Sequence, residues 1–223
     1  VMRRLGTIRR LSVDVDISCQ MPKARFDAKL ADIGRRVPFL RWEQRHRRQP
    51  PLPKKRHYYF DYHSVISDTE DHVILDVLEE DNLYPSVGEL PVAMPFFIPD
   101  HRIMVHIPAV EGLLGDKLTA FAPTTVGLPY DPASPVDIIK QLFDIGQLFD
   151  AMLDLPAVCG AYARVFTAEN SYRQNKHAPD KALGDTYQTA LALTSAELTK
   201  KTVTTNAPLL VAGVKNITPL LVQ

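Results

Sequence analysis

The segment Arg9-Arg10-Leu11-Ser12-Val13-Asp14-Val15-Asp16-Ile17 alternates apolar and polar residues from Leu11 onward. A period of two predicts a β-strand that is buried on the face of its four apolar side chains. Asp14 and Asp16 then share the opposite face, about 7 Å apart at the backbone for a rise of ~3.3 Å per residue. Two carboxylates at that spacing are able to ligate one hard divalent cation, or a pair, together with phosphate oxygens. A solvated edge strand gives the same alternation, so the pattern alone leaves both interpretations open.

The length and composition indicate a globular protein. A chain of 223 residues is long enough to bury a core as one large domain or two small ones. No apolar run approaches the ~20 residues that a membrane span needs, and the Arg-rich N-terminus lacks the apolar region of a signal peptide. Cys19 and Cys159 are isolated in the sequence, which predicts two free thiols in a reducing compartment. We therefore expect a cytoplasmic protein that has no membrane partner.

The net charge of zero conceals an uneven distribution of charge. Residues 1–57 contain 16 Lys and Arg against 5 Asp and Glu, whereas residues 58–223 contain 10 against 21. A basic part of this kind attracts nucleic acid or nucleotide phosphate. The alternatives are that the basic and acidic parts attract each other, or that the Arg-rich residues 35–56 form a solvated surface.

The first half of the chain predicts one helix and several short strands. Residues 27–40 have apolar side chains at helical spacing, which predicts a short helix that Pro38 ends. Residues 41–56 are rich in Lys and Arg and contain three prolines, which is typical of a charged loop or hairpin tip. Strands are expected over residues 56–66 and 71–78, with shorter strands over 90–97 and 102–107.

Asp76 interrupts the apolar run of the strand expected over residues 71–78. A carboxylate without a partner is costly to bury, so Asp76 is expected to face a cation or strong hydrogen-bond donors. Alternation along the strand could instead turn Asp76 toward water. Ile74 shares its face, however, so that face is not simply polar.

From Pro108 onward the apolar spacing becomes helical. Lys117 lies among the apolar positions of the first expected helix, and Asp137, Lys140 and Asp144 form a polar stripe on the second. Ordinary ion pairing among the residues of that stripe is the simplest explanation for it. The expected helices cover residues 108–122, 135–153, 156–176 and 179–200, and a weaker one covers 209–222, where Gly213 and Pro219 interrupt it.

Four segments over residues 9–150 carry polar residues at characteristic spacings. They are the R-x-S-x-D-x-D strand from Arg10 to Asp16, the second acidic strand Ile74-Leu75-Asp76-Val77, the K-x-x-A helix Gly115-Asp116-Lys117-Leu118-Thr119-Ala120, and the helical segment Ile139-Lys140-Gln141-Leu142-Phe143-Asp144. In order and spacing these segments together resemble the AbiEii/AbiGii toxin family of nucleotidyltransferases, within the DNA polymerase beta superfamily, whose last motif is R-D-x-[YF]-D.

This resemblance implies an α+β fold, in which a nucleotidyltransferase domain over residues 1–107 precedes a helical domain over residues 108–223. Asp14, Asp16 and Asp76 would hold two Mg²⁺ ions that bridge the nucleotide phosphates. Ser12 would lie near the phosphates, and Lys117 would bind a phosphate oxygen. Asp144 would position Lys117 or the acceptor.

The resemblance also implies a reaction and its partners. The protein would transfer a nucleoside monophosphate from a nucleoside triphosphate to an RNA acceptor, such as tRNA, or to a protein. It would be the toxin of a bacterial toxin–antitoxin or phage-abortive-infection pair, with a cognate antitoxin. The physical requirements agree, because nucleotidyl transfer depends mainly on alignment and on neutralising developing charge.

Two departures from the family pattern leave other functions open. Only Leu5-Gly6-Thr7 stands where the family has a Gly-Gly-Ser or Gly-Gly-Thr turn, so either an N-terminal strand and helix are missing or the chain is a degraded relative. Lys140-Gln141 replaces the family's Arg-Asp. A catalytically inactive nucleotide-binding or regulatory relative is therefore the main alternative, and a metal-dependent phosphohydrolase is the third.

Overall fold

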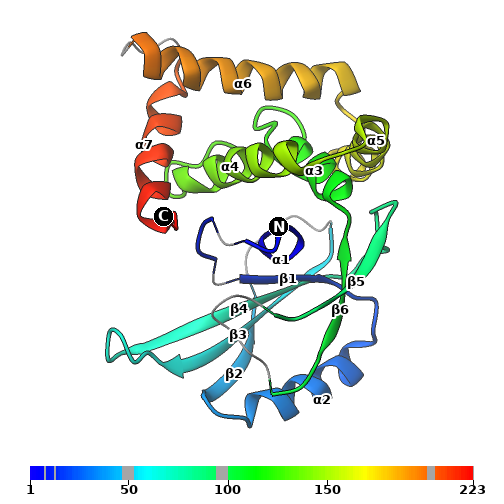
Figure 1. Ribbon diagram of the computed structural model, residues 1–223, viewed down its shortest axis with the longest axis vertical. Helices are drawn as coiled ribbons and strands as arrows, with labels where there is room; N and C mark the ends of the chain where they lie inside the picture. The colour runs from blue at the N-terminus through cyan, green and yellow to red at the C-terminus, as the bar shows by residue number, and fades with distance from the viewer. Residues whose placement is uncertain (8, 13, 47–52, 94–99, 200–203, 223) are drawn as a thin grey trace. The chain divides into compact units, whose positions relative to one another are not determined.

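The computed structural model describes residues 1–223 except 8, 13, 47–52, 94–99, 200–203 and 223 (Figure 1). The chain divides into two compact units. One unit is Ser12–Asn82, and the other combines Val1–Leu11 with Leu83–Gln223. The chain therefore begins in the unit that contains Leu83–Gln223, leaves it after Leu11 and returns to it at Leu83.

The unit Ser12–Asn82 is a four-stranded mixed sheet with one helix. The strand order is β1-β4-β3-β2, so β1 is an edge strand. β1 runs parallel to β4, and the other neighbours are antiparallel. The elements are β1 (Asp14–Ser18), α2 (Lys23–Gly34), β2 (Phe39–Arg45), β3 (Lys55–His63) and β4 (Glu70–Leu78).

The two faces of this sheet differ in chemistry because each strand alternates. Helix α2 covers the apolar face, where Phe26 and Leu30 pack against a group of buried strand side chains, namely Tyr58, Phe60 and Val77. The opposite face carries Asp14, Asp16 and Asp76, the histidines of β3 and β4, and Arg41. Tyr59 and Asp61 face away from the apolar side of β3, because they alternate with Tyr58 and Phe60 along the strand.

The other unit consists of a β-hairpin and a group of packed helices (Figure 1). Helices α3 and α4 pack against each other, α3 also packs against α5, and α4 packs against α7. The prediction of an α+β fold with a mixed sheet followed by helices is confirmed. The elements are α1 (Met2–Leu5), β5 (Val87–Pro91), β6 (Met104–Pro108), α3 (Val110–Ala120), α4 (Pro135–Ala151), α5 (Leu155–Tyr172), α6 (Pro179–Thr199), α7 (Ala207–Ile217) and the 3₁₀ turn η1 (Thr218–Leu220).

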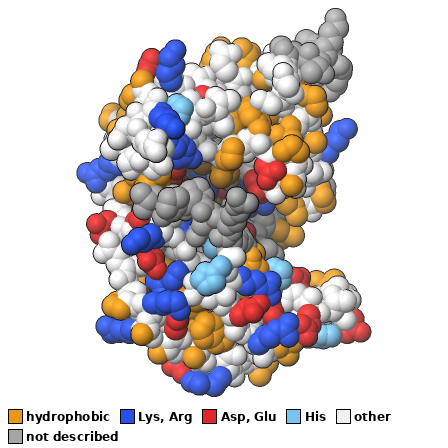
Figure 2. Space-filling view, turned by 180° about the vertical axis from the view of Figure 1, so that it is seen from behind, with side chains coloured by type: hydrophobic (Ala, Val, Ile, Leu, Met, Phe, Trp, Pro, Cys, Tyr) orange, Lys and Arg blue, Asp and Glu red, His pale blue; other side chains and the backbone are white. Residues whose placement is uncertain are grey.

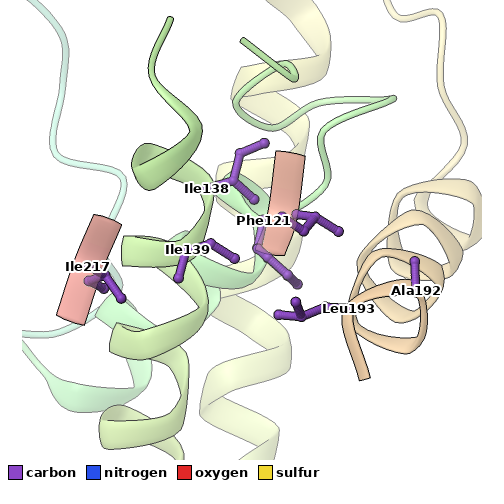
Figure 3. Close-up of a cluster of buried hydrophobic side chains, with 7 residues drawn as sticks. Phe121, Ile138, Ile139, Ala192, Leu193 and Ile217 are labelled. Atoms are coloured by element: carbon purple, nitrogen blue, oxygen red, sulfur yellow. The ribbon is translucent and has the colours of Figure 1, made fainter. Parts of the chain in front are cut away.

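The largest apolar cluster of this unit joins four helical segments (Figure 3). Phe121, which ends α3, is fully buried beside Ile138 of α4 and Leu193 of α6. Ile217 of α7 belongs to the same cluster. These contacts fix α3 and α4, the two helices that carry the remaining candidate site residues.

The prediction for residues 27–56 is wrong in two respects. Helix α2 begins at Lys23 and ends at Gly34, several residues before Pro38. Residues 39–45 form strand β2 and not a charged loop. A Cβ atom on Gly34 would lie 2.1 Å from the Trp42 ring, so only glycine lets Trp42 pack so close to the helix. Residues 47–52 of the expected loop lie outside the described residues.

The expected break of the last helix at Gly213 is also wrong. Helix α7 continues through Gly213. A Cβ atom on Gly213 would lie 2.4 Å from the Pro135 carbonyl oxygen of α4. Glycine is therefore needed for close helix packing at this position, and Pro219 lies in η1 beyond the helix end.

The apolar face expected for the first strand is only partly buried. Leu11 lies outside β1 and is exposed, and Val15 is 48% exposed because β1 is an edge strand. Val13, and the end of the strand expected over residues 90–97, lie outside the described residues. Within the described part of the chain, no helix is both long and apolar enough to cross a membrane.

Candidate functional site

Three acids lie on one face of the sheet in the unit Ser12–Asn82. In the parallel pairing of β1 and β4, Asp16 lies directly beside Asp76, and Asp14 lies beside Ile74. Side chains at paired positions point to the same face, and neighbouring strands are about 4.8 Å apart. Asp14, Asp16 and Asp76 therefore form an acidic face that two strands build together.

His57 holds the third acid of this face. Asp76 is also paired with His57 of β3, and the His57 Nδ1 atom lies 2.7 Å from Asp76 Oδ1. The His57 side chain is only 7% exposed, whereas that of Asp76 is 27% exposed. A buried imidazole at hydrogen-bond distance restricts the rotation of the carboxylate, so His57 orients Asp76 on the acidic face.

The acidic face has the donor chemistry that a hard cation requires. Carboxylate oxygens are the ligands that Mg²⁺ prefers, and Asp14 and Asp16 are both exposed. In the rotamers of the described residues, however, no three His, Cys, Asp or Glu side chains come together closely enough to hold a metal ion. The strand register places the three acids on one face of the sheet, and a metal site there stays a prediction.

Basic side chains on the same sheet face are paired with acids. Arg41 Nε lies 2.7 Å from Asp61 Oδ2, and Arg41 Nη2 donates to Glu70 at 2.8 Å. The hydrogen bond that Arg41 donates to Glu70, together with the negative charges of Glu70 and Asp61, raises the pKa of Arg41 above its ordinary value. The Arg45 guanidinium lies 4.2 Å from the centre of the Tyr59 ring. These contacts engage the two arginines within the sheet.

This pairing bears on the uneven charge of the sequence. The unit Ser12–Asn82 has 12 Lys and Arg against 13 Asp and Glu, so the basic residues 1–57 do not correspond to a basic folded unit. Figure 2 shows Lys and Arg side chains interspersed with Asp and Glu among the described residues on the face in view. The structure thus favours the interpretation that basic and acidic parts of the sequence attract each other.

Lys117 lies on α3 in the other unit, half-buried against α4. Its Nζ atom donates a hydrogen bond to Gln141 Oε1 at 3.0 Å. Gln141 in turn donates to the backbone oxygen of Asp137. Gln141 stands where the family pattern has an acid, so the partner of Lys117 here is a neutral amide. The positive charge of Lys117 is therefore oriented by Gln141 without being neutralised by it.

Asp144 of α4 forms a buried ion pair with Arg10. Arg10 Nε donates to Asp144 Oδ1 at 2.9 Å, and Arg10 Nη2 donates to Oδ2 at 2.7 Å. The Asp144 side chain is 3% exposed and that of Arg10 is 13% exposed. Within the polar stripe expected on α4, Lys140 pairs with Asp137, while Asp144 is engaged by Arg10.

The two remaining phosphate-binding candidates belong to loops. Ser12 is exposed and precedes β1. Gly6 follows α1 with φ +69°, a left-handed conformation that favours glycine, and Thr7 beside it is exposed. Gly6 and Thr7 lie in the unit of the helices, whereas Ser12 opens the unit of the sheet.

The sequence did not single out three residues that the structure connects to the candidates. Arg10 was part of a motif, but its partner lies 134 residues away. Gln141 was seen as a departure from the family pattern, and its contact with Lys117 depends on how α3 packs on α4. His57 could have been found, because strand alternation places it on the same face as Tyr59 and Asp61.

A mixed sheet with a D-x-D edge strand and a third acid on its parallel neighbour has the architecture expected of a nucleotidyltransferase. The family model described as "Nucleotidyl transferase AbiEii toxin, Type IV TA system" matches residues 1–207. The chain therefore belongs to the AbiEii family of nucleotidyltransferase toxins, and the resemblance found in its motifs is confirmed. No curated protein matches the chain.

Proposed function

We propose that this protein transfers a nucleoside monophosphate from a nucleoside triphosphate to an acceptor hydroxyl on RNA, such as a tRNA end, or on a protein. The acceptor oxygen would attack the α-phosphorus while the bond to the leaving pyrophosphate breaks. The single observation that carries this proposal is the register that places Asp16 beside Asp76, with Asp14 on the same face. Family membership supplies the reaction class and the expectation of a cognate antitoxin.

In this proposal Asp14, Asp16 and Asp76 would hold Mg²⁺, most simply as two ions. Magnesium would neutralise charge on the triphosphate and on the leaving pyrophosphate. The role of His57 is to keep Asp76 in a single orientation, so that one of its oxygens stays directed at the site. Ser12, which precedes β1, would donate a hydrogen bond to a phosphate oxygen.

Lys117 would supply a fixed positive charge to a phosphate oxygen in the same reaction. Gln141 orients its ammonium group and leaves the charge available. The ammonium group of a lysine is a compact positive charge, and it stabilises the negative charge that develops on phosphate oxygens during phosphoryl transfer. We also infer that the reaction takes place in the cytoplasm, where nucleoside triphosphates and tRNA are found together.

Labelling tests this proposal. The wild-type protein, incubated with each α-³²P-labelled nucleoside triphosphate and Mg²⁺, should label either total tRNA or a protein. Asp14→Ala and Lys117→Ala should each abolish that labelling, because they remove a ligand of the cation and a charge on the phosphate. Unchanged labelling by either variant would contradict the roles proposed for these residues.

An inactive nucleotide-binding relative is the second candidate, and Leu5-Gly6-Thr7 in place of the family's Gly-Gly-Ser or Gly-Gly-Thr turn favours it. Calorimetry with Mg²⁺ and each nucleoside triphosphate separates the two candidates. A binder without activity gives heat and no labelled product, whereas an active enzyme gives both. Release of inorganic phosphate would indicate a phosphohydrolase.

A further inference from the structure

The Arg10 guanidinium occupies both oxygens of the Asp144 carboxylate. Each of its two oxygens accepts one hydrogen bond from Arg10, in the paired geometry that gives arginine–carboxylate contacts their strength and direction. At 3% exposure, the side chain has almost no surface on which a substrate could bind. An acid that acts directly on a substrate needs an accessible oxygen. The contacts of Asp144 thus indicate a role that is exercised through Arg10.

The backbone around Arg10 is held as well. Leu11 N donates to the Leu220 oxygen at 2.7 Å, and Val222 N donates to the Arg9 oxygen at 2.9 Å. Arg10 itself forms an antiparallel bridge with Leu221. Residues 9–11 are therefore fixed by the C-terminal segment through their main chain and by α4 through the Arg10 side chain.

This anchored segment is one of the two places where the chain passes between the compact units. Leu11 is the last residue of the helical unit before the chain enters the sheet unit at Ser12. Asp14 follows Arg10 by four residues, which reach at most about 14 Å at ~3.5 Å per residue. Fixing Arg10 on α4 therefore limits the positions that Asp14 is able to reach.

We propose that Arg10 and Asp144 are positioning residues, whose ion pair anchors the connection into the D-x-D strand, and that Asp144 acts without touching nucleotide or acceptor. This inference rests on the nucleotidyl transfer proposed above. It assigns Asp144 a partner and a role that neither the motif nor its place on α4 reveals. Loss of the pair would loosen Asp14–Ser18 and misplace Asp14 and Asp16, while their carboxylates stay intact.

A charge exchange tests the proposal. Arg10→Asp and Asp144→Arg should each lower labelling by tenfold or more, and the double variant should recover most of it. Recovery of thermal stability without labelling in the double variant would overturn the proposal, because it would show that the Asp144 carboxylate itself is needed for the reaction. The control Glu169→Gln removes another carboxylate, which is paired at 2.7 Å with Arg173 at the end of α5, and should leave labelling unchanged.

A second measurement does not depend on activity, or on the charge-exchanged chains folding. Asp144→Asn keeps the shape of the side chain and weakens the pair, so hydrogen exchange should accelerate at least tenfold over Asp14–Ser18 and stay unchanged over Leu155–Tyr172. Equal exchange of Asp14–Ser18 in variant and wild type would overturn the anchor. If the wild type labels no acceptor, the proposed function fails, and the exchange result still decides whether the anchor exists.

Discussion

Gly115→Ala should destabilise the protein, because glycine at this position allows α3 and α5 to touch. A Cβ atom there would lie 2.6 Å from the Tyr162 backbone nitrogen and 2.9 Å from the Ala161 Cβ. Backbone atoms cannot rotate away, so the two helices must separate. Overpacking of this kind costs about 1–3 kcal/mol, and the better helix propensity of alanine returns about 1 kcal/mol. We expect a net loss of up to about 2 kcal/mol in the free energy of unfolding.

The assay is denaturant unfolding followed by circular dichroism, with Gly160→Ala as the matched control. Gly160 lies on α5, and a Cβ there would meet no described atom within 4 Å, so its alanine variant should gain about 0.5–1 kcal/mol. Since Lys117 is two residues from Gly115 on α3, Gly115→Ala should also lower nucleotide labelling. Equal stability of Gly115→Ala and Gly160→Ala would refute the reasoning about helix contact.

Two further predictions concern buried and paired polar groups. Burial, and then the charge of Asp185, raise the pKa of Tyr162 to about 12, and its hydroxyl has no hydrogen-bond partner among the described residues. Tyr162→Phe should therefore raise the melting temperature by about 2–4 °C, for a gain of about 1 kcal/mol; a lower melting temperature would contradict this. Partial burial works to raise the pKa of Asp27, but hydrogen bonds from Lys23 and Tyr58 outweigh it and hold the pKa below the ordinary 3.8. The stability that the ionised Asp27 carboxylate contributes is present above about pH 4 and is lost as the pH falls further. Asp27→Asn should therefore lose less stability than wild type between pH 5 and pH 2.5. Parallel curves of stability against pH for the two proteins would contradict the stabilising role of the hydrogen bonds to Asp27.

Local sequence patterns predicted the helices and strands in which apolar residues recur at a regular spacing. The long helices after Pro108 were predicted because their apolar residues recur at helical spacing. Strand β2 was missed because its charges suggested a loop, whereas Arg41 is paired with Asp61 and Glu70 of other strands, and Trp42 packs at Gly34. Those partners are distant in sequence, so local composition does not reveal them.

The sequence predicted only those features of the candidate site that depend on local pattern. Alternation showed that Asp14 and Asp16 share a face, but which residue lies beside Asp16 depends on the strand register, and the register arises from the whole sheet. The ion pair of Arg10 and Asp144 joins residues 134 positions apart, and only the packing of the first residues onto α4 brings them together.

The most direct test of the acidic face compares two acids on one strand. Asp76 and Asp71 both lie on β4, but their positions differ by five residues, so they face opposite sides of the sheet. In the α-³²P labelling assay, the rate of Asp76→Asn should be at least 100-fold below that of the wild type, and the rate of Asp71→Asn should equal that of the wild type. Equal rates for the two variants, with both proteins folded, would contradict the claim that Asp14, Asp16 and Asp76 form the site of nucleotidyl transfer.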